Sequence, residues 1–157
     1  MEKSKKVVVI GVGNLLLKDE GVGVHIAHAL QQVNMPHGVE IIDGGTSPDL
    51  PAYFDEADKL IIIDAVKAGG EPGTAYRFHP DDLTPEAERA ISVHQFGLGQ
   101  SLKMMSLMGN KPKEIVIIGI EPKEIGWGTE LSAELEQRVP EIIKVVVGEI
   151  SQGSQVR

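Results

Sequence analysis

Three ionisable side chains, Glu20, Asp64 and His94, stand where an apolar segment has ended and loop residues begin. Glu20 closes the loop that follows the apolar residues 7–10, and Asp64 follows the apolar residues 60–63. His94 stands in a predicted loop just before a helix start. In an open α/β sheet, the loops at the carboxyl ends of the strands converge on one crevice, where ligands bind. Two carboxylates and one imidazole meeting there would form a metal site or an acid/base site.

Each of the three side chains also has a structural interpretation. Glu20 shares a predicted helix start with Asp19, where a carboxylate interacts favourably with the helix dipole and the free amides. One of this pair can cap the helix while the other points into the crevice. Asp64 follows four apolar residues and is therefore pushed toward burial, where a carboxylate needs a partner. A lone loop histidine is usually solvated, so His94 carries meaning only in combination with the two acids.

Two carboxylate oxygens and one imidazole nitrogen suit a borderline divalent ion such as nickel, zinc or cadmium, and leave coordination positions open. Such an ion could polarise a carbonyl group or lower the pKa of an attacking water. Alternatively, Glu20 or Asp64 acts as a general base on water and the metal serves only as an anchor. The sequence leaves both roles open. The chain contains no cysteine, which excludes a thiolate metal site in the protein itself.

The elements that must position these residues follow a β-α-β-α-β order in the first part of the chain. This order predicts a parallel sheet with right-handed crossovers. We expect an α/β fold with three α/β/α layers, in which helices flank a twisted, mainly parallel five-stranded sheet. Residues 1–157 should form a single domain, with 151–157 as a frayed tail. The predicted strands are 7–12, 39–42, 60–63, 74–79 (an edge strand) and 114–120, and the predicted helices are 22–33, 49–58, 97–108 and 131–150, with Pro140 kinking the last helix or starting another.

Composition limits the classes of partner. The net charge of -8 argues against contacts with nucleic-acid phosphates, which require a basic face. No stretch approaches the roughly 20 apolar residues of a membrane span, and glycines interrupt the first apolar run, so no signal peptide is predicted. We expect a cytoplasmic protein without nucleic-acid or membrane partners. The length and charge also favour a monomer.

The glycines of Gly11-Val12-Gly13-Asn14 after the first strand invite a dinucleotide-binding interpretation. That motif needs a third glycine at the helix start, and Leu16 stands at the corresponding position. Asp43 after the second strand does mimic the acid that binds a ribose. A nucleotide-binding α/β enzyme therefore remains an alternative, although a disfavoured one.

The same motifs, taken in order, resemble those of the nickel-iron hydrogenase maturation endopeptidases. The resemblance extends from about Val7 to the final helix and is much more specific than any one motif. It implies the twisted, mainly parallel α/β sheet predicted above. The matching segments are Gly11-Val12-Gly13-Asn14, Asp19-Glu20-Gly21-Val22-Gly23, Asp43-Gly44-Gly45-Thr46, Ile63-Asp64-Ala65, His94-Gln95 and Gly119-Ile120-Glu121-Pro122.

The resemblance implies an endopeptidase that removes a C-terminal extension from the precursor of a hydrogenase large subunit after nickel insertion. Glu20, Asp64 and His94 stand at the family's metal-binding positions. The nickel would be carried by the substrate, and zinc or cadmium could occupy the same ligands. An alternative within this resemblance is a nickel-dependent chaperone that docks the precursor without cutting it. Trp127 stands between Gly126 and Gly128 in the loop after the last predicted strand, and this aromatic loop suits contact with a partner or, alternatively, covers the core.

Overall fold

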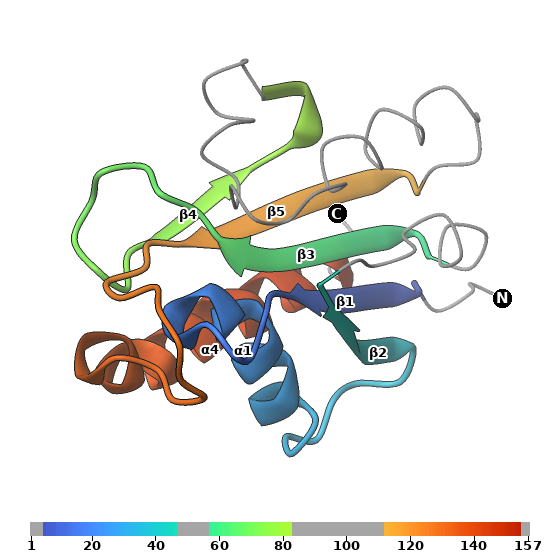
Figure 1. Cartoon of the computed structure of the whole chain (residues 1–157). Coiled ribbons are helices and arrows are strands. Elements are labelled where there is room, and N and C mark those ends of the chain that lie inside the picture. Colours follow the sequence, from blue (N-terminus) through green and yellow to red (C-terminus); the bar gives the residue numbers. More distant parts are fainter. Residues whose placement is uncertain (1–4, 47–56, 83–111, 155–157) are drawn as a thin grey trace, which may run out of the picture.

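The computed structural model of the protein describes residues 5–46, 57–82 and 112–154, and Figure 1 shows how these segments are arranged. Their strands form a five-stranded sheet in the order β2-β1-β3-β5-β4. The pairs β1–β2, β1–β3 and β3–β5 are parallel, whereas β4 pairs antiparallel with β5 at one edge. The elements are β1 Val7–Val12, η1 Lys18–Gly21, α1 Val22–Leu30, β2 Val39–Gly45, β3 Lys59–Ala65, β4 Ala75–Phe78, η3 Pro80–Asp82, β5 Glu114–Ile120 and α4 Ala133–Ser154.

The predicted α/β fold with a mainly parallel five-stranded sheet is confirmed. β1 and β3 are buried along their whole length, as expected for central strands made of β-branched and other apolar residues. The edge strand predicted over residues 74–79 is β4, and its antiparallel direction accounts for the mixed character of the sheet. Among the helices that the structure describes, none is long and apolar enough to cross a membrane.

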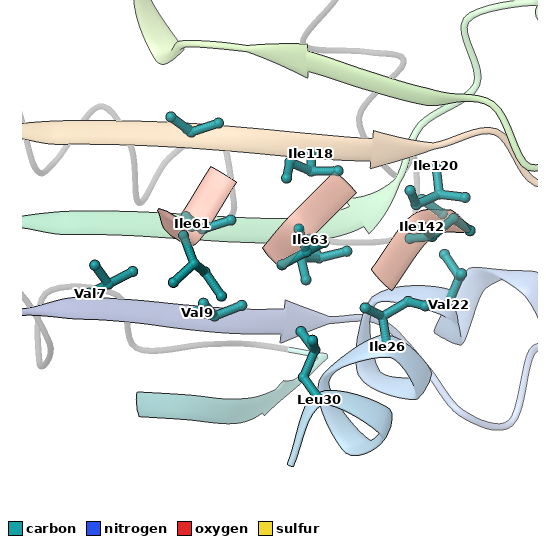
Figure 2. Packing of buried hydrophobic residues seen from close by; sticks show 14 of the residues in the cluster. Val7, Val9, Val22, Ile26, Leu30, Ile61, Ile63, Ile118, Ile120 and Ile142 are labelled. Carbon is teal, nitrogen blue, oxygen red and sulfur yellow. The ribbon is translucent and has the colours of Figure 1, made fainter. Parts of the chain in front are cut away.

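Side chains that alternate along the strands build two apolar clusters, one on each face of the sheet. Figure 2 shows the first cluster, in which Val9 of β1 and Ile63 of β3 pack with Ile26 of α1 and Ile142 of α4. The second cluster includes Ile10 and Ile62 on the opposite face. Asp64 has the same parity as Ile62 and therefore belongs to that opposite face. Both described long helices, α1 and α4, cover the first face (Figure 1).

The described helices differ from the predicted ones in extent. Of the helix predicted over residues 49–58 the structure describes only 57 and 58, which are not helical, and the helix predicted over 97–108 lies outside the described residues. The final helix is longer than predicted, since α4 runs through Ser154 with Pro140 inside it. The expectation of a frayed tail from residue 151 is therefore wrong for 151–154. The buried side chains of α4 continue to Ile150 and hold this end of the helix against the sheet. Organisation of the whole chain as one domain stays a prediction.

Candidate active site

The carboxyl ends of β1, β3 and β5 lie at one edge of the sheet, together with the loops that follow them and the start of α1 (Figure 1). The pairing of β1 with β3 ends at Gly11 and Ile63, whereas β3 and β5 stay paired for two further residues. The last two residues of β3 therefore have no partner on β1. The short helix η1, which lies between β1 and α1, contacts β3. This is the edge at which the sequence predicts the site.

Asp64 lies inside β3, because the strand extends through Ala65 instead of ending at Ile63 as predicted. Its side chain is fully buried. The backbone N–H of Ala65 donates to Oδ1 at 2.8 Å, and Oδ2 is buried with no hydrogen-bond partner among the described residues. Burial raises the pKa of Asp64 well above its usual range, the Ala65 N–H lowers it, and the negative charge of Glu20 raises it further. Asp64 is thus a carboxylate in need of a proton or a cation.

Glu20 belongs to the short 3-10 helix η1 and is 1% exposed. The helix η1 contacts β3, the strand that carries Asp64, at the carboxyl end of the sheet. The structure therefore brings two of the three predicted site residues together. The third, His94, lies outside the described residues, and within the described segments no three potential ligands cluster in a metal-binding arrangement.

Two glycines permit this convergence. A side chain at Gly13 would collide with the carbonyl oxygen of Glu20, and the residue has φ +154°. A side chain at Gly23 would collide with the carbonyl oxygens of Ile63 and Val12. Glycine is needed where backbone segments approach this closely. Gly13 and Gly23 therefore allow a tight exit from β1, and this exit lets the segment of Glu20 lie beside β3.

Asp19 plays a part that the sequence does not reveal. It is fully buried, and its side chain caps neither η1 nor α1. Instead it accepts hydrogen bonds from Lys123, Glu124 and Ser132, which lie in the loop after β5. Asp19 is therefore not the member of the Asp19–Glu20 pair that caps a helix of its own segment. A local pattern cannot identify donors that lie more than 100 positions away in the chain.

Glu121 organises the neighbouring loop in a similar way. Its Oε1 accepts hydrogen bonds from the N–H groups of Ala68 and Gly70, at 2.8 and 3.2 Å, and from the hydroxyl of Tyr76 at 2.7 Å. These donors belong to the loop that follows Asp64 and to β4. The sequence singles out Glu121 only as part of a resemblance. The structure shows that it anchors a loop at the same edge as Asp64.

Asp43, the acid that would bind a ribose in a nucleotide-binding enzyme, is bonded within the protein. His28 Nε2 lies 2.8 Å from Asp43 Oδ2, and the Gly45 N–H donates to Asp43 Oδ1 at 2.9 Å. Both oxygens of Asp43 thus have partners within the protein. His25 on α1 is half-buried, and burial, followed by the nearby His28, lowers its pKa, so it favours the neutral form. The Trp127 side chain is 82% exposed and so does not cover the core, and contact of its loop with a partner stays a prediction.

Comparison with known proteins is consistent across sequence and structure. The family model described as hydrogenase maturation protease matches residues 24–149, a stretch that begins after Glu20 and includes Asp64 and His94. Hydrogenase 2 maturation protease of Escherichia coli is 34% identical over 145 residues, covering 90% of this chain and 88% of the relative. Hydrogenase expression/formation protein HupD of Thiocapsa roseopersicina is 34% identical over 157 residues, covering 97% and 71%. The structure of the hydrogenase-maturating endopeptidase HybD from E. coli superposes with a TM-score of 0.78 at 30% identity, covering 94% and 93%.

Proposed function

Because this chain belongs to the hydrogenase maturation protease family and is accordingly an endopeptidase, we propose that it recognises its substrate through nickel. The substrate is the precursor of a nickel-iron hydrogenase large subunit, and the bond cut releases the C-terminal extension of that precursor. The nickel arrives already bound to the precursor. Glu20, Asp64 and His94 then complete its coordination shell and so fix the scissile bond against the protease.

The observation that carries this proposal is the buried pair of carboxylates, Glu20 and Asp64, at the carboxyl edge of the sheet. Two like charges buried in proximity are unfavourable unless a cation or a proton compensates them. Carboxylate oxygens suit a divalent ion, and Asp64 Oδ2 is a buried oxygen with no protein donor among the described residues. The donor set therefore fits an ion such as nickel, with zinc or cadmium as substitutes.

The absence of cysteine supports nickel as part of the substrate. Two carboxylates and one imidazole hold a borderline ion only modestly, whereas thiolates hold it much better. A cysteine-containing site on the precursor would therefore keep its nickel when the protease docks. The protease offers no thiolate that could extract the ion.

The chain's own groups supply positioning and proton transfer. Hydrolysis requires water to add to the scissile carbonyl carbon and a base to accept the water proton. Asp64 Oδ1 is held by the Ala65 N–H, so Oδ2 is the oxygen available to accept a proton or to bind a cation. A divalent ion at these residues would supply charge stabilisation to the developing oxyanion. Burial of both carboxylates excludes bulk water and strengthens each electrostatic interaction at the reacting bond.

The decisive experiment compares precursor prepared with and without nickel. Each form is incubated with the purified protease, and release of the C-terminal peptide is followed by mass spectrometry. We expect release only from the nickel-loaded form. Equal release from both forms would refute nickel-dependent recognition while leaving the assignment as a protease intact. Precursor bound without any cleavage would instead support the chaperone alternative.

A further inference from the structure

Asp19 is a fully buried carboxylate with four hydrogen bonds, all received from one segment of the chain. Its Oδ2 accepts from the backbone N–H groups of Lys123 and Glu124, at 2.9 and 2.8 Å, and from the Ser132 hydroxyl at 2.7 Å. Its Oδ1 accepts from the Ser132 N–H at 2.7 Å. Hydrogen bonds to an ionised acceptor are roughly twice as strong as neutral ones. The carboxylate thus binds two ends of the same loop, residues 123–132.

Backbone hydrogen bonds also join the residues around Asp19 to the loop 123–132. The Asp19 N–H donates to the Glu124 carbonyl at 3.0 Å, and the Lys18 N–H donates to the Gly128 carbonyl at 2.8 Å. The Gly128 N–H in turn donates to the Leu16 carbonyl at 2.9 Å. Every bond joins the segment that precedes Glu20 to the loop after β5. The loop 123–132 therefore holds η1 in place through hydrogen bonds.

The short helix η1 depends on these contacts for its conformation. It has only four residues, and no side chain caps its start at Leu17. Short 3-10 helices have poor hydrogen-bond geometry and hold their shape through surrounding contacts. Glu20 is the neighbour of Asp19 in this segment, so the position of its carboxylate depends on where the loop holds Asp19. Asp64, in contrast, is fixed by its place inside β3.

We infer that Asp19 is a positioning residue for the peptidase reaction. It holds Glu20 at the correct separation from Asp64 and links that separation to the loop 123–132, which displays Trp127. The inference rests on the proposed function in one respect, namely that Glu20 faces the substrate-bound ion. Misplacement of a reacting or binding group by about 1 Å can reduce a rate by about 100-fold. Asp19 therefore controls the reaction without touching the substrate.

The test uses Asp19→Asn in the full chain. Asparagine preserves the size of the side chain and one acceptor oxygen, but places an NH₂ group against the remaining donors. We expect kcat on nickel-loaded precursor to fall about 100-fold and Cd²⁺ affinity, measured by calorimetry on the protease alone, to fall about 10-fold or more. Fluorescence anisotropy of Trp127, the single tryptophan of the chain, should fall as the loop is released.

Glu149→Gln is the matched control, because Glu149 of α4 is a buried, multiply hydrogen-bonded carboxylate that binds Lys59 at the start of β3, away from its carboxyl end. It should lose stability and keep wild-type kcat, Cd²⁺ affinity and anisotropy. If Asp19→Asn lowers only the melting temperature, as Glu149→Gln does, Asp19 is a structural residue and the inference is overturned.

Ser132→Gly provides a second, milder variant in case Asp19→Asn does not fold. It removes the hydroxyl donor to Asp19, and glycine is tolerated nearly as well as serine at a helix start. The same losses should appear, each reduced to several-fold, and an unchanged kcat and Cd²⁺ affinity would contradict the inference. Failure of the proposed function is recognised separately, because wild-type protease would then process nickel-free precursor equally well. The ratio of variant to wild-type kcat would still decide the role of Asp19.

Discussion

The buried carboxylates Asp64 and Glu149 have different surroundings, so replacing each by its amide should have opposite effects. Glu149 Oε2 lies 2.6 Å from Lys59 Nζ, and Oε1 lies 2.6 Å from Arg77 Nε. Asp64 Oδ1 accepts a hydrogen bond from the Ala65 N–H, and Oδ2 has no hydrogen-bond partner within the described segments. Glu149→Gln removes a compensated charge, whereas Asp64→Asn removes an uncompensated one.

The magnitudes follow from burial. In Glu149→Gln, Lys59 stays only 2% exposed and retains the Glu149 carbonyl at 2.8 Å and the half-buried Glu114 at 3.7 Å. Breaking a buried ion pair on one side costs about 3–5 kcal/mol, and the remaining contacts favour the lower end, about 3 kcal/mol. For a domain of this size that lowers the melting temperature by about 6–12 °C. Asp64→Asn should change stability by less than about 1 kcal/mol, or raise it.

Thermal unfolding followed by circular dichroism at pH 7 measures both effects, with a chelator present so that no bound ion stabilises the wild type. Cleavage of nickel-loaded precursor is then measured well below both melting temperatures. We expect Asp64→Asn to lose at least about 100-fold in rate and Glu149→Gln to keep the wild-type rate. A drop of several degrees for Asp64→Asn would refute the argument, because it would mean that the charge of Asp64 is compensated in the metal-free protein.

Three further outcomes are expected. Burial raises the pKa of Glu149, but the hydrogen bonds and charges of Arg77 and Lys59 lower it more, so the net shift is downward. The stability that Glu149 contributes is present above its unfolded pKa of 4.5 and is lost as the pH falls through the folded pKa. Urea titrations should therefore show a smaller difference in free energy of unfolding between wild type and Glu149→Gln at pH 3 than at pH 7. Gly23→Ala should destabilise by about 1–3 kcal/mol and slow cleavage, since its methyl group meets backbone carbonyls, whereas Gly148→Ala in α4, with open space around it, should stabilise by about 0.4–1 kcal/mol; equal melting temperatures would contradict this. Trp127→Ala should leave stability within about 0.5 kcal/mol, because the side chain is 82% exposed, and should raise KM for the precursor; an unchanged KM would exclude contact with the substrate.

Local patterns in the sequence predict the strands and the convergence of the acids well. Runs of β-branched residues identify β1, β3 and β5, since a strand buried on both faces must be apolar throughout. The topological rule for parallel sheets then places Glu20 and Asp64 at the same edge. Asp64 could be marked as buried because it follows four apolar residues in a row.

Contacts between distant segments are what the sequence does not reveal. Asp19 and Glu20 are adjacent carboxylates, and only the position of the loop 123–132 decides that Asp19 is the one this loop binds. Lys59 looks like a solvated residue before an apolar strand, yet it is 2% exposed. Its burial depends on Glu149, on a different element, and no periodicity in either segment points to the other. The helix α4 extends to Ser154 although its last buried residue is Ile150 and residues 151–152 are exposed, so no apolar pattern marks this end.

The pairing of Lys59 with Glu149 also has a consequence for biosynthesis. The two residues are 90 positions apart, which corresponds to roughly 5–20 s of translation at about 5–20 residues per second. Until Glu149 leaves the ribosome, Lys59 has only the half-buried Glu114, 3.7 Å away, to compensate its charge, so burial of the start of β3 is less favourable. We therefore expect β3, the strand that carries Asp64, to pack fully only once α4 has been made.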